Sequence, residues 1–224
     1  MRRWLALVAA CLPAAAAVGA TAPEVALDVG HFLEKPGVIS VTGVPEFEYN
    51  KALAFKVRET LEAAGLRVRM IGERGDFADL YERVKAARGA DLFVSIHHDS
   101  VQEQYLPVAD KFAGFSLFVS RTNPQVTKSL ACASAIGAQM LKAGFTRSLY
   151  HADPVLGEAR PFADETNGVH YFDNLAVAKH ATTPALLFEA GVIVNRNEEA
   201  RLARPETQAL IANAIAQGVT RCLE

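Results

Sequence analysis

The pattern of hydrophobic and polar positions divides the chain into short apolar runs and longer amphipathic segments. The short runs are rich in Val, Ile, Leu and Phe, which is typical of buried strands. We predict strands at residues 25–29, 67–71, 91–96, 114–119 and 185–188. The amphipathic segments repeat apolar residues three or four positions apart, and they predict helices over residues 50–64, 77–87, 125–143 and from Pro205 onward.

Strands that alternate with helices indicate an α/β fold, with a largely parallel mixed sheet flanked by helices in a single domain. One segment shows neither the pattern of a strand nor the periodicity of a helix. Residues 144–168 contain Pro154, Pro161 and several acidic residues, so we expect a long surface loop. Loops of this length in a compact domain are usually functional or mobile. A passive connector is the alternative.

The first twenty residues have the organisation of a secretory leader. Two arginines after Met1 precede an acid-free apolar run from Trp4 to Val18, and small residues follow up to Ala20. We predict a signal peptide over residues 1–20, a mature domain over residues 21–224 and a periplasmic location. A membrane anchor needs roughly 20 apolar residues, which is longer than this run. A lipoprotein leader ending at Cys11 is a further alternative. No later stretch is apolar enough to span a membrane.

Composition and charge exclude several functions. The 224 residues include 23 Lys or Arg and 25 Asp or Glu, which gives a net charge of −2. Removing residues 1–20 takes away two Arg and no acid, so the mature chain carries −4. Because it has no basic stripe, we expect no nucleic-acid partner. The sequence lacks glycine-rich nucleotide-binding motifs, H-E-x-x-H and G-x-S-x-G.

Two cysteines, Cys132 and Cys222, lie beyond the predicted leader. An oxidising compartment would permit a disulfide between them. Two buried free thiols are the alternative, because pairing depends on a geometry that sequence does not give. There is no C-x-x-C motif, so neither a redox pair nor a cysteine zinc site is indicated.

Polar side chains follow the carboxyl ends of three predicted strands, where ligands bind in parallel sheets. They are His31, then His97 and His98, then Glu189, with Glu46 and Glu48 ahead of the helix at residue 50. Taken one at a time, each histidine could be an ordinary loop residue. Glu46 or Glu48 could be a first-turn carboxylate that the helix dipole favours. Glu189 is harder to explain structurally, since an unpaired carboxylate in a central strand is costly. Two imidazoles and a carboxylate suit zinc, and a second carboxylate outside the coordination sphere suits a general base.

Four blocks at these residues resemble the zinc-dependent N-acetylmuramoyl-L-alanine amidases, bacterial cell-wall hydrolases, and the resemblance extends over roughly residues 25–223. Residues 26–31 look like the family's D-P-G-H turn, with Val29 in place of proline. Residues 46–54 are similar to its E-x-x-x-N-x-x-[IL]-A helix entry, which selects Glu46 over Glu48. Residues 92–97 and 183–191 resemble the strands of the second histidine and of the catalytic glutamate.

The resemblance implies that His31, Glu46 and His97 hold one Zn²⁺ and that Glu189 acts in acid/base catalysis. Neighbouring positions of an extended segment point to opposite faces, so we expect only one of His97 and His98 to reach the metal, and we choose His97. The whole of residues 21–224 would then form the amidase catalytic domain.

The implied reaction is hydrolysis of the amide bond between N-acetylmuramic acid and the L-alanine of the peptidoglycan stem peptide. The expected partners are peptidoglycan or muropeptides, together with a protein activator. A zinc peptidase acting on stem peptides and a non-catalytic peptidoglycan-binding relative are the alternatives. Arg147 and Arg160, both in the long loop, are candidates to meet stem-peptide carboxylates.

Overall fold

The computed structural model describes residues 21–224 and contains one sheet with helices on both faces. The predicted signal peptide and Cys11 lie outside the described residues. Seven strands form the sheet in the order β2-β1-β3-β7-β4-β6-β5. Their bounds are Glu24–Val29 (β1), Arg67–Ile71 (β2), Leu92–Asp99 (β3), Ser116–Val119 (β4), Phe162–Asp164 (β5), Val169–Tyr171 (β6) and Ala185–Val192 (β7).

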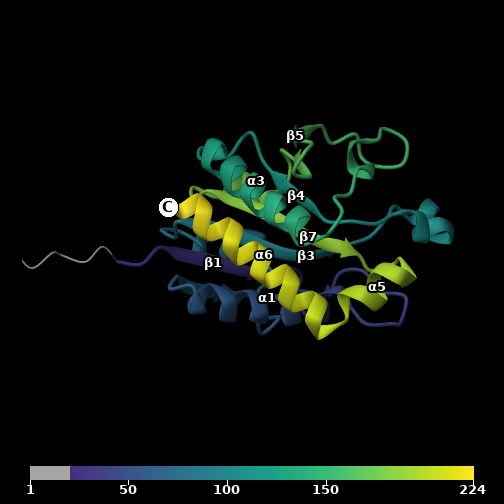
Figure 1. Cartoon of the computed structure of the whole chain (residues 1–224), viewed down its shortest axis with the longest axis horizontal. Coiled ribbons are helices and arrows are strands. Elements are labelled where there is room, and N and C mark those ends of the chain that lie inside the picture. The colour runs from purple at the N-terminus through teal and green to yellow at the C-terminus, as the bar shows by residue number, and fades with distance from the viewer. Residues whose placement is uncertain (1–20) are drawn as a thin grey trace, which may run out of the picture.

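Two layers of helices bury the two faces of the sheet. The helices are Glu46–Ala63 (α1), Leu80–Ala86 (α2), Val126–Lys142 (α3), Ala176–His180 (α4), Arg196–Leu202 (α5) and Pro205–Leu223 (α6), with 3-10 turns at Glu103–Lys111 (η1) and Tyr150–Ala152 (η2). Helices α1, α3 and α6 pack on one face and share one apolar core with it (Figure 1). Helices α2 and α4 share a smaller core with the other face. Within residues 21–224, none of the helices combines the length and apolarity needed to cross a bilayer.

The pairing of the strands confirms the predicted α/β fold with a largely parallel mixed sheet. Strands β2, β1, β3 and β7 pair in parallel, as do β4 and β6, whereas β4–β7 and β5–β6 are antiparallel. The carboxyl ends of β1, β3 and β7 therefore meet at one edge of the sheet. This edge gathers the polar residues that the sequence places after these strands.

Three predicted elements are shorter, at one end, than the observed ones. Strand β3 continues beyond Ile96 to Asp99, and β7 continues beyond Phe188 to Val192. Both extensions contain polar residues, but their backbones still find partners in the neighbouring strand, so the ladder continues. Helix α1 begins at Glu46 rather than at residue 50. The short elements β5, β6, α4 and α5 were not predicted, and the expected loop at 144–168 is irregular apart from η2 and β5.

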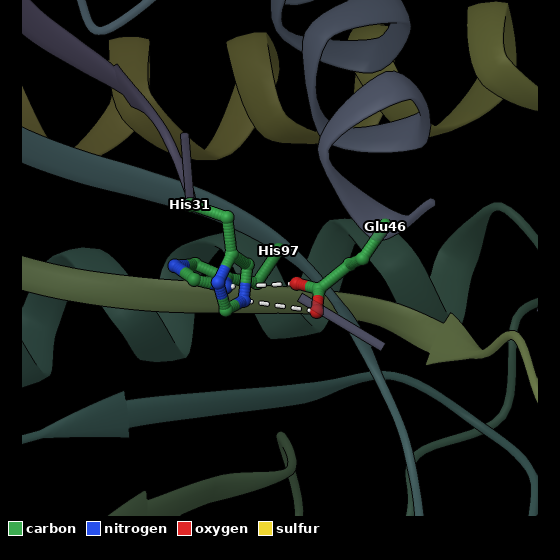
Figure 2. Close-up of side chains that lie close together, drawn as sticks. All are labelled: His31, Glu46 and His97. Carbon is green, nitrogen blue, oxygen red and sulfur yellow. Dashed lines mark hydrogen bonds and ion pairs between the residues drawn. The ribbon is translucent and has the colours of Figure 1, made fainter. Parts of the chain in front are cut away.

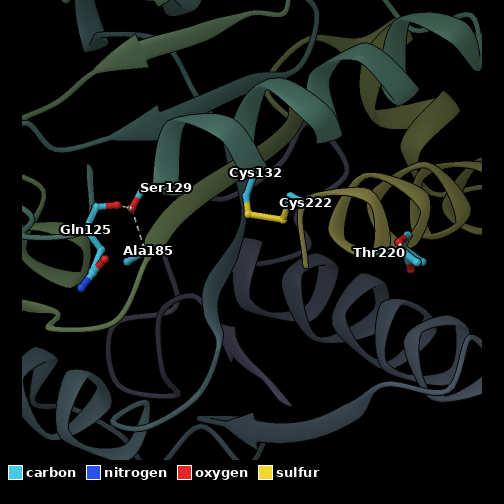
Figure 3. Close-up of a disulfide and its surroundings, with 7 residues drawn as sticks. Gln125, Ser129, Cys132, Ala185, Thr220 and Cys222 are labelled. Carbon is cyan, nitrogen blue, oxygen red and sulfur yellow. Dashed lines mark hydrogen bonds between the residues drawn. A yellow bond between two sulfur atoms is a disulfide. The ribbon is translucent and has the colours of Figure 1, made fainter. Parts of the chain in front are cut away.

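A disulfide joins Cys132 on α3 to Cys222 on α6, across 90 residues of sequence (Figure 3). The sequence left this bond and two free thiols as alternatives, and the structure contains the bond. The two helices also approach closely at Gly218, where an added Cβ would lie 2.5 Å from Cα of Ile136. The bond therefore fixes two helices that already pack backbone to backbone on one face of the sheet.

Candidate metal centre and active site

Three side chains from different parts of the chain, His31, Glu46 and His97, converge at the carboxyl edge of the sheet (Figure 2). Nε2 of His31 lies 2.9 Å from Oε2 of Glu46, and Nδ1 of His97 lies 3.0 Å from Oε1. The two imidazole rings meet edge to face with centroids 4.9 Å apart. The three candidate ligand atoms lie within 4.8 Å of one another. Two imidazoles and one carboxylate at such spacing can hold a single small cation.

His31 occupies a backbone conformation that needs support. Its φ is +67°, in the left-handed region that non-glycine residues seldom adopt. The buried guanidinium of Arg83 donates to the carbonyl oxygens of His31 and, at 2.6 Å, of Val29. The same guanidinium pairs with Asp28 at 2.6 Å, and both side chains are at most 2% exposed. Arg83 therefore holds the turn that presents the first histidine.

Glu46 is held in place by the residues around it. It stands at the first turn of α1 with 3% of its surface exposed. Its Oε1 accepts hydrogen bonds from Nδ2 of Asn50 at 3.0 Å and from the backbone N–H of His98 at 3.3 Å. Its Oε2 accepts one from the N–H of Val38 at 3.3 Å. These donors come from a helix, a strand and a loop, so the carboxylate has little freedom to rotate.

The environment keeps Glu46 ionised. Burial would raise the pKa of its carboxyl group, but hydrogen bonds to His31 and His97 and the charges of these rings outweigh burial. The pKa of Glu46 is held well below its usual range. Gly37, at φ +80°, allows the close approach, because a Cβ there would lie 2.3 Å from Oε2. An ionised carboxylate is the form that binds a metal.

His97 and His98 turn to opposite faces of β3. The ring of His97 lies against Gly30, where an added Cβ would come within 2.3 Å of it. The ring of His98 turns toward α1, where Nδ1 lies 2.8 Å from Oδ1 of Asn50 and the ring packs against Tyr49. Burial lowers the pKa of His98 to about 4. The structure thus brings His97 beside Glu46 and leaves His98 as a neutral, hydrogen-bonded side chain within the fold.

Glu189 lies beside His97, one of the three converging side chains. On β7 it pairs with His97 of β3 on one side and with Ser116 of β4 on the other. Its Oε2 is buried and has no hydrogen-bond partner in residues 21–224. A buried carboxyl oxygen without a partner is costly, so it marks a place where a water molecule or a substrate atom would be bound.

The charges around Glu189 favour its protonated form. Burial raises the pKa of the carboxyl group well above its ordinary value, and the negative charges of Asp99 and Glu46 raise it further. The positive charge of Arg160 opposes that rise. A carboxyl group whose pKa is shifted toward neutral pH can both accept and return a proton.

The long loop contributes a buried polar network that the sequence did not predict. The Tyr150 hydroxyl donates to Oδ2 of Asp99. The ring of His151 bridges two carboxylates, with Nε2 2.8 Å from Asp99 and Nδ1 2.9 Å from Glu158. The network fixes the loop to the end of β3, two residues after His97. The only signal in the sequence was a Tyr-His pair inside an acidic loop.

An apolar cavity of about 370 Å³ opens beside His31 and His97, between the sheet and helices α2 and α4. Six of the side chains that line it are Phe32, Ala78, Leu80, Leu175, Val177 and Leu187. A concave apolar site next to a few converging polar groups is the usual form of a substrate-binding site.

This chain is similar to known proteins that share a single enzymatic activity. A family model described as N-acetylmuramoyl-L-alanine amidase matches residues 25–221. The N-acetylmuramoyl-L-alanine amidase AmiA of Escherichia coli (strain K12) is 28% identical over 215 residues, which cover 87% of this chain and 74% of AmiA.

Solved structures of amidases have the same fold. The catalytic domain of CwlV, an N-acetylmuramoyl-L-alanine amidase from Bacillus (Paenibacillus) polymyxa var. colistinus, matches with a TM-score of 0.70 at 27% identity, over 89% of this chain and 97% of that domain. The CwlD amidase of Clostridioides difficile, solved in complex with the GerS lipoprotein, matches with a TM-score of 0.69 at 23% identity, over 90% of this chain and 98% of that one.

Proposed function

This chain belongs to the N-acetylmuramoyl-L-alanine amidase family, a family of hydrolases that act on peptidoglycan, and we propose that it is a zinc-dependent member. The bond cleaved would join N-acetylmuramic acid to the L-alanine of the stem peptide. The observation that carries the proposal is the convergence of His31, Glu46 and His97 beside a partly buried glutamate, Glu189. A zinc peptidase would use the same side chains, but the family favours the amidase.

The donor set fits zinc. Imidazoles and carboxylates are common zinc ligands, and three protein ligands are typical of catalytic rather than structural zinc sites. We propose that His31 Nε2, His97 Nδ1 and a carboxylate oxygen of Glu46 are the ligand atoms, since these are the atoms that converge. When bound, zinc supplies Lewis-acid polarisation of the amide carbonyl and lowers the pKa of a water molecule from about 15.7 to about 7.

Glu189 would move the protons. In its ionised form it accepts a proton from the attacking water, and it then passes that proton to the nitrogen of the leaving L-alanine. The absence of a hydrogen-bond partner for Oε2 in the described residues supports this role, because the carboxyl group is not already engaged in the fold. The raised pKa supports it as well, since a carboxylate with a lower pKa would be a weaker base and would accept the water proton less readily.

We also propose that residues 1–20 are removed on export and that residues 21–224 act in the periplasm. The Cys132–Cys222 disulfide supports an oxidising compartment. The alternative of lipid attachment at Cys11 would leave the same domain tethered to a membrane. The structure of the CwlD amidase was solved in complex with the GerS lipoprotein, which is a parallel for a protein partner of this chain. An activator would act on this chain by changing access to the sheet edge that carries Glu189.

Digestion of purified sacculi tests the reaction. The mature protein is stripped with a chelator, and aliquots are reloaded with zinc before the released ends are identified by mass spectrometry. We expect intact stem peptides with a free L-alanine amino terminus in the zinc-loaded aliquot and none in the stripped one. Stems cut between their amino acids would indicate the peptidase. Binding to sacculi without zinc-dependent release would indicate the non-catalytic relative.

A further inference from the structure

The guanidinium of Arg160 lies over two aromatic rings, those of Phe118 and Phe172, on the sheet face that carries Glu189. Its central carbon lies 3.7 Å from the centroid of the Phe172 ring and 5.1 Å from that of Phe118. The side chain is 21% exposed, so it is neither free in solvent nor closed off. Its ion pair with Glu158 uses Nε, at 3.6 Å, which leaves the two terminal nitrogens for another partner.

Hydrogen bonds hold the backbone on both sides of Arg160. The N–H of Arg160 donates to the carbonyl of His151 at 2.8 Å, and His151 in turn binds Asp99 at the end of β3. The next residue, Pro161, accepts a hydrogen bond from the N–H of Tyr171 at 2.8 Å. A planar fork of donors that is already ordered loses little entropy when it binds a carboxylate.

Arg160 also lies over the sheet face to which Glu189 belongs. Phe118 pairs with Leu187 across β4 and β7, and Glu189 follows Leu187 by two residues on the same face. A substrate bound at Glu189 would therefore extend over or beside this guanidinium.

The other candidate cation of the loop, Arg147, is placed differently. An added Cβ at Gly168 would lie 2.9 Å from Cβ of Arg147 and 3.2 Å from the ring of Phe115. Phe115 belongs to the core beneath α1, α3 and α6, which covers the opposite face of the sheet. The structure therefore separates the two arginines that the sequence left equivalent.

Building on the proposed function, we propose that Arg160 is a specificity-determining residue that binds a carboxylate of the stem peptide while the scissile amide lies at Glu189. Stem peptides are acidic, and the arginine fork matches a carboxylate with two parallel hydrogen bonds. Lysine offers only a point charge and would replace it in part. The site therefore selects substrates with free carboxylates over their amidated forms.

Kinetics with a matched pair of substrates test this. A soluble muropeptide with free carboxyl groups and the same muropeptide with amidated carboxyl groups are hydrolysed by wild type, Arg160→Gln and Arg160→Lys. We expect wild type to favour the free acid by about tenfold or more in kcat/KM, mainly through KM. Arg160→Gln should lose this preference, and Arg160→Lys should retain part of it. The ratio is measured within one sample, so incomplete folding of a variant cancels.

Arg121→Gln is the matched control. Arg121 also stacks on an aromatic ring, that of Tyr171, and also pairs with a carboxylate, that of Asp173, but it follows β4 at the end remote from Glu189. Its loss removes the same charge and should leave the preference unchanged. A preference that persists in Arg160→Gln, or that is lost equally in Arg121→Gln, would overturn the proposal.

Calorimetry with the isolated stem peptide separates this proposal from the reaction itself, because binding needs no cleavage. Wild type should bind the acidic peptide more tightly than the amidated one, and Arg160→Gln should bind both alike. Release of stem peptides with no effect of Arg160 on either measurement would reject the subsite and retain the amidase. Arg160-dependent binding of the acidic peptide without any zinc-dependent release would retain the subsite and reject the amidase.

Discussion

His97 and Glu189 occupy paired positions on the neighbouring parallel strands β3 and β7. Residues paired in this way point to the same face of a sheet, and adjacent strands lie about 4.8 Å apart. A slip of one residue would turn one of the two side chains to the other face. The register of a central strand pair therefore sets the spacing between the candidate metal ligand and the candidate base, and this rigid spacing does not depend on loop conformation.

Replacing Glu189 with Gln should separate catalysis from metal binding. The amide has nearly the shape of the carboxylate but cannot accept a proton, so we expect activity to fall about a hundredfold to ten-thousandfold. Zinc content, measured by atomic emission on the purified protein, should stay near one ion per chain. If the variant loses zinc as well, Glu189 is a ligand and the assigned role is wrong.

Removing each of the adjacent histidines should have opposite effects on zinc. His97→Ala deletes the proposed ligand atom Nδ1, which lies 3.0 Å from Glu46, so we expect zinc to be lost during dialysis. His98→Ala removes a ring that faces Asn50 and Tyr49, so zinc should be retained while stability falls. The two variants are matched in size and strand, which makes each the control for the other. If only His98→Ala loses zinc, His98 is the metal ligand and His97 is the structural side chain.

The features that could be predicted from the sequence are those that depend on local patterns of residues. Apolar runs located the strands that form the middle of the sheet, and polar residues at their ends located the side chains that converge. That His97 and His98 turn to opposite faces followed from the alternation of an extended chain, whereas the choice of His97 came from the resemblance. That β3 and β7 would continue through these residues did not follow, because polar side chains end an apolar run although they do not end the backbone ladder.

Other features depend on contacts between distant residues, which no local pattern contains. The clamp of Arg83 on Val29 and His31 joins residues more than fifty positions apart. Burial of His151 between two carboxylates requires the long loop to fold back on β3. The disulfide likewise requires α3 and α6 to be neighbours. Such features follow from the packed fold and could not be derived from spacing.

Arg83→Met should weaken both the fold and the metal site. The substitution leaves the carboxylate of Asp28 buried without its cation, which typically costs about 3–5 kcal/mol in the free energy of unfolding. It also frees the left-handed turn at His31, so the affinity for zinc should fall. Urea unfolding of the apo protein and zinc titration measure the two effects. Adding Asp28→Asn should restore part of the stability but not the affinity; equal recovery of both would refute the positioning role.

Replacing both Cys132 and Cys222 with Ala should lower stability without changing the reaction. Closing a loop of 90 residues restricts the unfolded chain, and loss of such a bond typically costs about 2–5 kcal/mol. Wild type unfolded in the presence of a reductant should match the double variant. The bond lies on the face covered by α3 and α6, opposite Glu189, so kcat/KM at 25 °C should change less than twofold. A reductant that leaves the wild-type midpoint unchanged would mean that the bond contributes nothing.

His151 should make stability depend on pH in the alkaline range. Burial disfavours its charged ring, but the charges and hydrogen bonds of Asp99 and Glu158 outweigh burial and raise the pKa of His151 to about 9. Because the folded pKa lies above the unfolded value of about 6.5, the charged ring contributes its full stability below about pH 6.5. The contribution is lost as the pH rises through 9, and it amounts to about 3 kcal/mol.

Urea unfolding of wild type and His151→Gln at pH 6 and pH 9.5 measures that loss. The stability difference between the two proteins should be large at pH 6 and should shrink by about 2–3 kcal/mol at pH 9.5. Burial and the charge of Asp99 raise the pKa of Tyr150, so its hydroxyl stays protonated throughout and does not contribute. Glu158 and His170, whose pKa values depend on His151, titrate below pH 6, and the remaining groups cancel in the difference. A difference that stays constant with pH would show that the ring is neutral between its two carboxylates, and the anchor of the long loop would then be an ordinary pair of hydrogen bonds.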